Sequence, residues 1–322
     1  MARHWTAADV PDLHGRTAVI TGGNTGLGFQ TAQVLAVRGA TVVLACRDPQ
    51  RAAAAATQIG DTPLRRTVDI VHVDLASQAS VREAAGRLRA RHPRIDLLIN
   101  NAGALMPRRS TSEDGFDLTL ATNHLGPFAF TGLLLGAMLA VPDARVVTVS
   151  SIGHRYGAGT INFDDLHFSD APEPRGPDRP AYFQSKLANL LFTYELQRRL
   201  TAAGAGTIAV AAHPGNARTE FGRALSPVAR ALMSPRARPL TWWLMQSPEV
   251  AALAVLRAAT DPEARGGDFF GPPGRFQFTG HPVKVDSSAA SHDEAAQRRL
   301  WAESERLTGV TFPIPAQLQR SG

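Results

Sequence analysis

Tyr182 and Lys186 are a pair of residues that could carry out chemistry together. They are four positions apart, and on a helix this spacing places both side chains on one face. An ammonium beside a phenol favours the phenolate and lowers the phenol pKa, so the pair could transfer protons. The sequence contains only two Lys residues, Lys186 and Lys284, among many Arg. Use of Lys here indicates a need for a compact cation with several donors.

The spacing of this pair does not by itself identify a site. Tyr194 and Arg198 repeat it on the same predicted helix, and such pairs also occur on ordinary protein surfaces. Whether Tyr182 does chemistry therefore depends on what the elements around it bring to the same place.

Length and composition limit the classes of protein to consider. A chain of 322 residues is long enough for one large α/β domain. No apolar run approaches the roughly 20 residues that span a bilayer, and the N-terminus lacks the apolar centre of a signal peptide, so we expect a cytoplasmic protein without a transmembrane segment. The single cysteine, Cys46, excludes an internal disulfide and a Cys-based metal cluster, and we expect no metal site.

The formal net charge of +6 raises the question of a nucleic-acid partner. The Arg residues are scattered among Ala and acidic residues, and no basic-aromatic motif is present. We therefore expect no nucleic-acid partner. Salt-dependent retention on DNA would test the opposite view, and a polyanionic cofactor would also suit the positive balance.

A glycine-rich segment follows the first predicted strand, residues 16–21, and precedes a helical pattern that ends at Gly39. Gly22 would allow a tight turn, Gly26 a close approach of the backbone to phosphate, and Gly28 close packing of helix on strand. The spacing G-x3-G-x-G differs from the commonest dinucleotide fingerprint, and a purely structural turn is the alternative. Together with its flanking strand and helix, the segment predicts phosphate binding.

The loops after the next strands carry further candidates. Arg47 follows the strand 40–46 at the place where an acid would bind a ribose hydroxyl and an Arg would accept a 2′-phosphate, which favours NADP(H) over NAD(H). Asp74 lies at the end of the strand 68–75, where an adenine would lie. Asn100-Asn101-Ala102-Gly103 follows the strand 95–100 and suits either a ligand loop or an ordinary turn.

The second half of the chain continues the alternation of strands and helices. A long helix is predicted over 114–139 and contains Asn123; a strand over 144–150 ends in Ser150-Ser151, and an irregular stretch covers 152–180. A helix over 180–203 and a strand over 207–214, followed by Pro214-Gly215, come next. Ser247-Pro248 then opens a helix, a strand lies near 267–271, and a terminal helix begins at a capping box of Ser291 and Glu294 and ends at Gly309.

This order predicts the fold class. Strands that read as continuous apolar runs and alternate with helices are typical of a parallel sheet covered on both faces. We expect one α/β domain over 1–322, a Rossmann-type doubly wound parallel sheet, with its core at about 15–275 and a C-terminal helical extension at about 290–309. In such sheets ligands bind beyond the carboxyl ends of the strands, so all the candidate residues lie on one rim.

With these residues in view, the chain resembles the short-chain dehydrogenase/reductase family. The matching motifs are TGGNTGLG at 21–28, NNAG at 100–103, Asn123, Ser150-Ser151, YFQSK at 182–186 and Pro214-Gly215, in the family's order. Within the family, the motifs LACRDP, NHLGPF, YFQSKLANLLFTYEL and HPGNARTE are similar to those of the retinol dehydrogenase, WW-domain oxidoreductase and protochlorophyllide reductase-like branch.

The resemblance implies an NADP(H)-dependent oxidoreductase that acts on a carbonyl or alcohol. It implies that Tyr182 is the general acid or base, that Lys186 lowers its pKa and holds the nicotinamide ribose, that Ser151 bonds the substrate oxygen, and that Asn123 supports Lys186 through a water. Ser150 is the rival of Ser151, although a shift of one residue on a strand turns the side chain to the other face. The implied cofactor-binding residues are Gly22, Asn24, Thr25, Gly26, Leu27, Gly28, Arg47, Asp74, Leu75, Asn101, Ala102, Gly103, Tyr182, Lys186, Pro214 and Gly215.

Two departures from the family pattern bear on specificity. The gap between Ser151 and Tyr182 is longer than in the short pattern, and Thr25 stands where some NADP-preferring members carry a basic residue. NAD(H) therefore remains the alternative cofactor. A nucleotide-binding regulatory or scaffold protein with the same fold is the alternative function, and joint retention of Asn123, Ser151, Tyr182 and Lys186 argues against it.

The segment 216–246 is expected to choose the substrate together with 152–180. It carries several aromatic and flexible apolar residues, Phe221, Leu225, Met233, Leu240, Trp242, Trp243 and Met245. Such a surface suits a bulky hydrophobic ketone, aldehyde or alcohol. The alternative is that the two Trp residues form a homo-oligomer contact or rest on a membrane surface.

Overall fold

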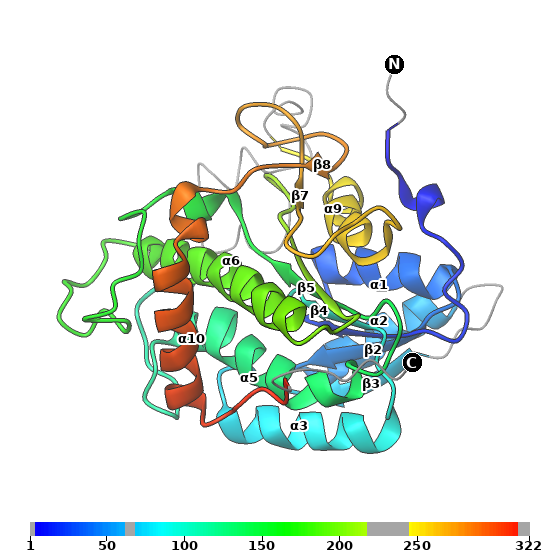
Figure 1. Ribbon diagram of the computed structural model, residues 1–322, viewed down its shortest axis with the longest axis horizontal. Coiled ribbons are helices and arrows are strands. Elements are labelled where there is room, and N and C mark those ends of the chain that lie inside the picture. The colour runs from blue at the N-terminus through cyan, green and yellow to red at the C-terminus, as the bar shows by residue number, and fades with distance from the viewer. Residues whose placement is uncertain (1–3, 62–67, 218–244, 315–322) are drawn as a thin grey trace.

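Eight strands form one sheet in the computed structural model of the chain, which describes residues 4–61, 68–217 and 245–314 (Figure 1). The strands are β1 (Thr17–Thr21), β2 (Thr41–Cys46), β3 (Val68–His72), β4 (Leu97–Asn100), β5 (Arg145–Val149), β6 (Ile208–Ala212), β7 (Phe269–Gly271) and β8 (Val283–Lys284). Their order across the sheet is β3-β2-β1-β4-β5-β6-β7-β8. Every neighbouring pair is parallel except β7 and β8.

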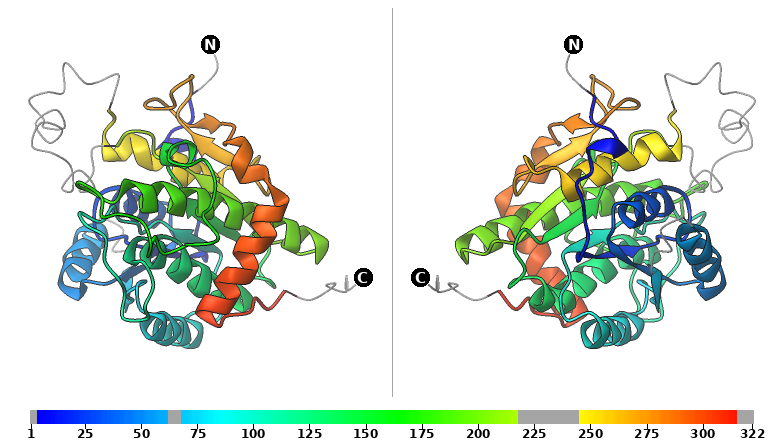
Figure 2. Two further views of the ribbon diagram at one scale, coloured as in Figure 1. Left: turned by 90° about the vertical axis from the view of Figure 1, so that its left-hand side faces the viewer. Right: turned by 90° about the vertical axis from the view of Figure 1, so that its right-hand side faces the viewer.

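The predicted single, doubly wound α/β domain is confirmed. The sheet has one hydrophobic core on each face, and adjacent residues of a strand contribute to opposite cores. Ile20 of β1 and Ile99 of β4 lie in one core, and their neighbours Val19 and Leu98 lie in the other. Strands buried on both faces explain the continuous apolar runs of the sequence. Helices α1 (Gly26–Val37), α2 (Pro49–Gly60) and α9 (Pro248–Thr260) cover one face, and α3 (Gln78–Arg91), α5 (Gly126–Leu134) and α6 (Arg179–Ala202) cover the other (Figures 1 and 2).

Several helices begin at side chains that accept hydrogen bonds from the first turn. Asp48 caps α2, Ser77 caps α3 and Ser247 caps α9. The prediction that Ser247 and Pro248 open a helix is confirmed. The antiparallel edge strand β8 was not predicted, because two residues carry too little pattern to be recognised.

The terminal helix α10 (Glu294–Thr308) packs against α6 and α5. The predicted capping box of Ser291 and Glu294 is wrong: Asp293 accepts from the amides of Ala295 and Ala296, while Ser291 Oγ donates to the carbonyl of Ser288. Gly309 ends the helix in the left-handed conformation, as expected. The buried Trp301 of α10 lies in the aromatic core beneath α5 and α6.

The long helix predicted over 114–139 is shorter and broken into turns of different pitch. It consists of α4 (Leu118–Leu120), a π-helical turn η2 (Ala121–Leu125), α5 and a 3-10 turn η3 (Leu135–Ala137). It begins late because Asp117 caps it at the amide of Leu120 and Thr111 pairs with Asp117 in a β-bridge. A π turn of this kind inserts a residue into a helix and often marks a functional site.

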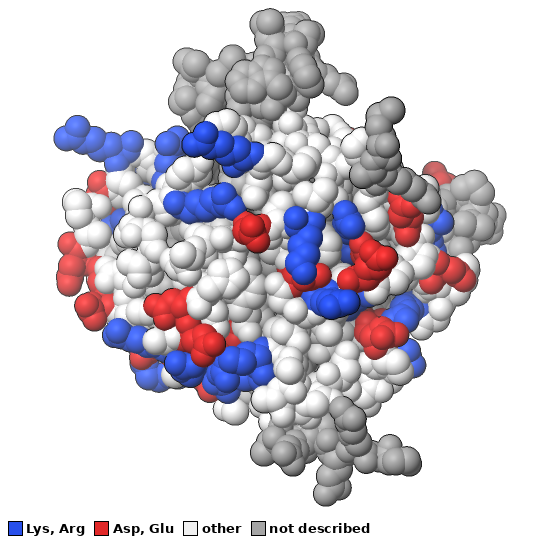
Figure 3. Space-filling model, turned by 45° about the horizontal axis from the view of Figure 1, so that its top comes forward, with Lys and Arg blue, Asp and Glu red and all other residues white. Residues whose placement is uncertain are grey.

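On the face drawn in Figure 3, basic and acidic side chains are interspersed rather than gathered by sign. Among the described residues no helix is long and apolar enough to cross a membrane.

Candidate active site

The glycine turn between β1 and α1 has the backbone conformation that the sequence predicted. Gly22 and Gly26 have φ of 65° and 53°, in the left-handed region that favours glycine. A Cβ on Gly28 would lie 2.4 Å from Asn101 Nδ2 and 2.5 Å from the carbonyl oxygen of Gly22, so only glycine fits there. Thr25, the N-cap residue of α1, makes no side-chain hydrogen bond to the helix. The first amides of α1 thus face an anion-binding position.

Asn101 locks the loop after β4 onto this turn. Its Nδ2 donates to the carbonyl oxygens of Thr21 and Gly22, at 2.8 and 3.3 Å. Thr21 Oγ1 accepts from the amides of Asn101 and Ala102, at 3.0 Å each. The two segments that the sequence assigned to the cofactor are therefore one connected surface. Thr21 also contributes to this surface, although it was not among the candidate residues.

Arg47 and Asp48 separate into two roles at the end of β2. The carboxylate of Asp48 accepts from the amides of Gln50 and Arg51, at 3.0 Å each, because it caps α2. Arg47 is exposed at the carboxyl end of the strand. The carboxylate of Asp48 is thus already engaged in holding the start of α2.

Asp74 and Leu75 shape the loop after β3. Asp74 Oδ1 accepts from the amide of Ala76 at 3.0 Å, and the Asp74 amide donates to Ser80 Oγ at 2.9 Å. The buried Leu75 lies against the start of α5, where a Cβ on Gly126 would be 2.1 Å from its carbonyl oxygen. The glycine allows this loop to pack directly on the helix that follows Asn123.

Asn123 lies within the π turn η2 and is fully buried. Its Oδ1 accepts from the amide of Ala104 at 2.7 Å, and its Nδ2 donates to the Ala104 carbonyl at 2.9 Å and to Ser185 Oγ at 3.0 Å. Ser185 Oγ in turn donates to the carbonyl of Tyr182 at 2.7 Å. Asn123 thus joins the loop after β4 to the helix of Tyr182, and Ser185 is a link that the sequence analysis missed although it lies within YFQSK.

Tyr182 and Lys186 are both buried on α6, beside the end of β5. Lys186 Nζ donates to the carbonyl oxygen of Val149 at 3.1 Å and lies 5.7 Å from the centroid of the Tyr182 ring. A Cβ on Gly103 would lie 3.0 Å from this Nζ and 3.4 Å from Asn123 Oδ1. The glycine of NNAG therefore lets the backbone approach both polar side chains.

The expected lowering of the Tyr182 pKa is not what the structure shows. Burial raises the pKa of Tyr182 to about 12, and a hydrogen bond with Ser151 opposes this only in part. Burial also lowers the pKa of Lys186 to about 8. Burial is the largest cause in both cases, so Tyr182 is a neutral phenol at physiological pH and can donate a proton.

Ser151, and not Ser150, lies on the side of Tyr182. Ser150 Oγ donates to the carbonyl of Lys186 at 2.8 Å, and so helps to hold α6 against β5. Ser151 Oγ accepts from the amide of Gly153 at 3.1 Å and is hydrogen-bonded to Tyr182. Both residues follow β5, and the backbone at Ser151 is still extended, so neighbouring side chains point to opposite sides.

Tyr194 and Arg198, the second pair with the same spacing, do not act on each other. Tyr194 OH is hydrogen-bonded to Ser287 Oγ at 2.8 Å. Arg198 pairs with Glu195, at 2.6 and 2.9 Å. This pair is structural.

Pro214 and Gly215 complete the rim after β6. Gly215 has φ of 61°, and a Cβ there would lie 2.3 Å from the carbonyl oxygen of Phe278. Pro214 O accepts from Gln246 Nε2 at 2.7 Å, and Ala217 pairs with Gln246 in a parallel bridge. The two ends of the segment 216–246 thus meet at the rim. Its candidate residues Phe221, Leu225, Met233, Leu240, Trp242 and Trp243 lie outside the described residues.

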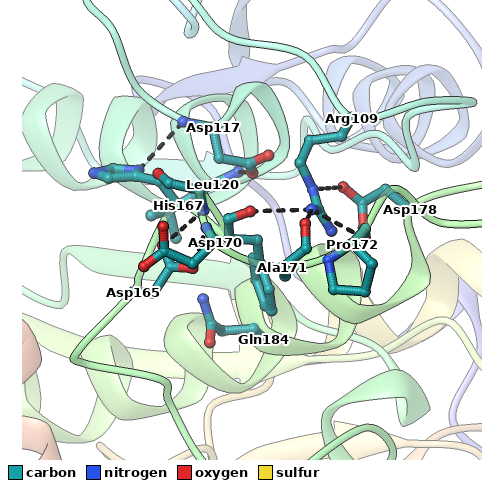
Figure 4. Close-up of polar contacts among 12 residues, drawn as sticks. Arg109, Asp117, Leu120, Asp165, His167, Asp170, Ala171, Pro172, Asp178 and Gln184 are labelled. Carbon is teal, nitrogen blue, oxygen red and sulfur yellow. Dashed lines mark hydrogen bonds and ion pairs between the residues drawn. The ribbon is translucent and has the colours of Figure 1, made fainter.

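The stretch 152–180 is irregular, as predicted, but strongly tied down. Arg109 donates to Asp178 at 3.2 Å and to the carbonyls of Phe168 and Ala171, at 3.0 and 2.8 Å (Figure 4). Gln184 of α6 accepts from the amide of Asn162 and donates to the carbonyl of Leu166. Side chains from the loop after β4 and from α6 therefore hold the stretch in place.

Among the residues that the structure describes, no group of His, Cys, Asp and Glu side chains could hold a metal ion. The glycine turn, Asn101, Gly103, Tyr182 and Lys186 instead form a continuous surface along the carboxyl ends of β1, β4 and β5. At Gly28 and Gly103 the missing side chain lets protein groups approach closely, which holds the glycine turn against Asn101 and the loop after β4 against Lys186.

Comparison with known proteins agrees with this geometry. Residues 16–162 match the family model for short chain dehydrogenase. The chain is 41% identical over 306 residues to human (Homo sapiens) retinol dehydrogenase 13, covering 94% of this chain and 87% of that protein. It is 38% identical over 305 residues to polyprenol dehydrogenase of Mus musculus, covering 94% and 86%.

Solved structures show the same fold. A crystal structure of an uncharacterized protein from Mycobacterium Paratuberculosis has a TM-score of 0.77 and 40% identity, covering 97% of this chain and all of that one. A short-chain dehydrogenase-like structure from Beutenbergia cavernae, described with NADP bound at low occupancy, has a TM-score of 0.62 and 27% identity, covering 80% of this chain and 95% of that one. With its fold, its site and these relatives agreeing, the chain belongs to the short-chain dehydrogenase/reductase family.

Proposed function

We propose that this oxidoreductase transfers a hydride between NADP(H) and a bulky hydrophobic carbonyl or alcohol. The observation that carries the proposal is the neutral Tyr182 phenol, hydrogen-bonded to Ser151 and beside Lys186, at the end of the surface that begins at the glycine turn. When bound, the nicotinamide supplies or accepts the hydride. Tyr182 and Ser151 donate hydrogen bonds to the substrate oxygen, where negative charge grows as hydride arrives.

The protonation state of Tyr182 suits the reductive direction. A phenol with a pKa of about 12 retains its proton at physiological pH and can pass it to the oxygen of a carbonyl. Lys186, with its pKa lowered to about 8 by burial, is still largely cationic near neutral pH and can hold a ribose hydroxyl while it faces the phenol.

Arg47 supports the choice of NADP(H). It is exposed at the end of β2, where a 2′-phosphate would lie, and the neighbouring Asp48 is engaged in capping α2. The relative from Beutenbergia cavernae is described with NADP bound at low occupancy.

A cavity that mixes apolar and charged side chains, the latter including Asp164, Asp293 and Arg299, reaches the helix of Tyr182 at Phe183. It has a volume of about 640 Å³ and lies between the stretch 156–168, α6 and the start of α10. Its apolar lining includes Tyr156, Ile161, Phe163, Phe168, Phe183 and Leu187. Phe183 follows Tyr182 directly, and the centroids of the two rings are 6.0 Å apart. The relatives whose names specify retinol and polyprenol suggest the same substrate class.

Three variants test the assignment. Tyr182→Phe is expected to abolish turnover and to leave NADPH binding nearly intact, whereas Lys186→Ala is expected to damage both. Tyr194→Phe is the matched control, because it removes the same hydroxyl from a partly buried tyrosine of the same helix. Turnover is followed by NADPH absorbance over a panel of carbonyls and alcohols. Loss of activity in Tyr194→Phe but not in Tyr182→Phe would show that the assignment is wrong.

The same panel addresses the alternative of a nucleotide-binding scaffold. If the unmodified protein binds NADPH with saturation but turns over neither long apolar carbonyls nor small polar ones, the regulatory function is favoured. Preference for small polar substrates would contradict the proposed substrate class while leaving the reaction type intact.

A further inference from the structure

His154 connects the catalytic loop to a distant part of the chain. It lies in the 3-10 turn η4 (Ile152–Arg155), two residues after the end of β5, and it is 1% exposed. Its Nδ1 lies 2.6 Å from the carbonyl oxygen of Ser151, and its Nε2 lies 3.1 Å from the amide nitrogen of Ser288. Ser288 belongs to the loop between β8 and α10, which we call the tail loop (residues 286–293).

The two backbone partners decide the tautomer of His154. A carbonyl oxygen only accepts, so Nδ1 must carry the hydrogen and donate it to Ser151. An amide only donates, so Nε2 must be bare and accept from Ser288. The imidazole is therefore neutral and held in one orientation. Burial agrees with this, because it lowers the pKa of His154 to about 4.

The carbonyl that His154 holds belongs to the residue whose hydroxyl faces Tyr182. The Ser151 carbonyl also accepts from the amide of His154 at 3.1 Å. The hydroxyl of the same residue accepts from the amide of Gly153 and is hydrogen-bonded to Tyr182. A Cβ on Gly153 would lie 3.2 Å from Tyr182 Cε1, so the turn packs closely against the phenol ring. Rotation of the Ser151 peptide would therefore move the hydroxyl away from Tyr182.

The tail loop supplies the fixed end of this connection. Arg155 donates to the carbonyl of Asp286 at 2.6 Å, and Ser287 is bonded to Tyr194 of α6. Ser291 Oγ donates to the carbonyl of Ser288 and so holds the loop internally. His154 thus accepts a hydrogen bond from an amide of the tail loop at one ring nitrogen and donates to the carbonyl of Ser151 at the other.

We propose that His154 is a positioning residue, which holds the Ser151 peptide through its Nδ1–H and so keeps the Ser151 hydroxyl aimed at the substrate oxygen. The proposal rests on the proposed function of Ser151 and Tyr182. The two ring nitrogens of His154 then have different roles. The hydrogen bond from Nδ1 to Ser151 supports turnover, and the hydrogen bond from Ser288 to Nε2 attaches the tail loop.

Two substitutions separate these bonds. In His154→Asn the side-chain amide can replace Nδ1–H at Ser151 but does not reach Ser288. In His154→Gln the amide oxygen can replace Nε2 at Ser288, and the donor to Ser151 is lost. Ser291→Ala is the matched control, because it loosens the tail loop from within and touches neither Ser151 nor His154.

The measurements are kcat with NADPH and the best carbonyl of the panel, the NADPH dissociation constant, and hydrogen exchange of the Gly153 amide. We expect His154→Gln to lower kcat by about 10-fold or more, within the ~100-fold range that a misplacement of about 1 Å can produce. His154→Asn and Ser291→Ala should keep kcat within about 3-fold of the unmodified protein by the same argument. NADPH binding should be unchanged in all three. The Gly153 amide should exchange faster only in His154→Gln.

Equal losses of kcat in His154→Asn and His154→Gln, or a loss in Ser291→Ala as large as in His154→Gln, would overturn the proposal. Absence of turnover in the unmodified protein would count against the proposed function instead. In that case the exchange of the Gly153 amide still decides whether His154 holds Ser151, because it requires no substrate. Unchanged exchange in His154→Gln would reject that role.

Discussion

Arg109 offers the sharpest test of how the site is held together. Its guanidinium is 13% exposed and pairs with Asp178, whose carboxylate is fully buried (Figure 4). Arg109 also donates to the carbonyls of Phe168 and Ala171. Asp178 precedes α6, and its carbonyl accepts from the amide of Tyr182 at 3.2 Å. The pair therefore joins the loop after β4 to the first turn of the catalytic helix.

The expected effect of Arg109→Met follows from burial. Removing one partner of a buried ion pair leaves an uncompensated charge and typically costs about 3–5 kcal/mol of unfolding free energy. Asp178→Asn in the same chain removes that charge. The double variant should then lose only ~1–3 kcal/mol, for the carbonyls of Phe168 and Ala171 that remain without their donor.

The assay is urea unfolding followed by circular dichroism, with Arg87→Met as the control. Arg87 pairs with Glu83 on the surface of α3, where both side chains are more than half exposed, and loss of such a pair costs at most about 1 kcal/mol. A double variant as unstable as Arg109→Met would show that the lost carbonyl bonds, and not the buried charge, carry the effect. Equal losses in Arg87→Met and Arg109→Met would refute the reasoning altogether.

Three further outcomes are expected. Gly126→Ala should lower the unfolding free energy by ~2 kcal/mol or more, because its Cβ would lie 2.1 Å from the Leu75 carbonyl oxygen. Gly136→Ala is the control: its Cβ would have nothing within 4 Å, so the variant should be as stable as the unmodified protein or slightly more stable. Similar unfolding free energies for the two variants in urea would contradict this. Burial raises the pKa of Asp117 from 3.8 to about 6, so the contribution of this carboxyl to stability is present below its unfolded pKa and is lost as pH rises through about 6. Asp117→Asn keeps an acceptor for the Leu120 amide and should therefore be more stable than the unmodified protein above pH 6. The difference in melting temperature between the two proteins should shrink as the pH falls toward the unfolded pKa of Asp117. A difference that does not depend on pH would reject this account. Arg47→Asp should weaken NADPH binding more than NADH binding in fluorescence titrations, and equal or tighter binding of NADH by the unmodified protein would contradict the cofactor assignment.

Much of the fold could be predicted because its signals are local. The continuous apolar strands, the glycine turn and the Ser247-Pro248 helix start each depend on residues a few positions apart. The spacing of Tyr182 and Lys186 on one helix is local in the same sense. The order of the loops then placed the candidates on one rim, since the carboxyl ends of parallel strands meet at the same edge.

The tertiary structure determines the burial, the pKa values and the hydrogen-bond partners of these residues. The sequence predicted a lowered pKa for Tyr182, but burial by distant segments raises it. Asp293 rather than Ser291 caps α10, because Ser291 bonds within the tail loop. Asn123 lies in a π turn and bonds Ala104 and Ser185 directly, contacts that no periodic pattern encodes.

His154 shows the same division most clearly. In the sequence it is one of ten His residues without a recognisable motif. Its two partners are backbone groups, one three residues away and the other 134 residues away. Backbone amides and carbonyls are the same in every residue, so the side-chain sequence cannot indicate which of them will meet an imidazole. Only the packing of the tail loop against the end of β5 determines that, because it fixes both the tautomer of His154 and the orientation of Ser151.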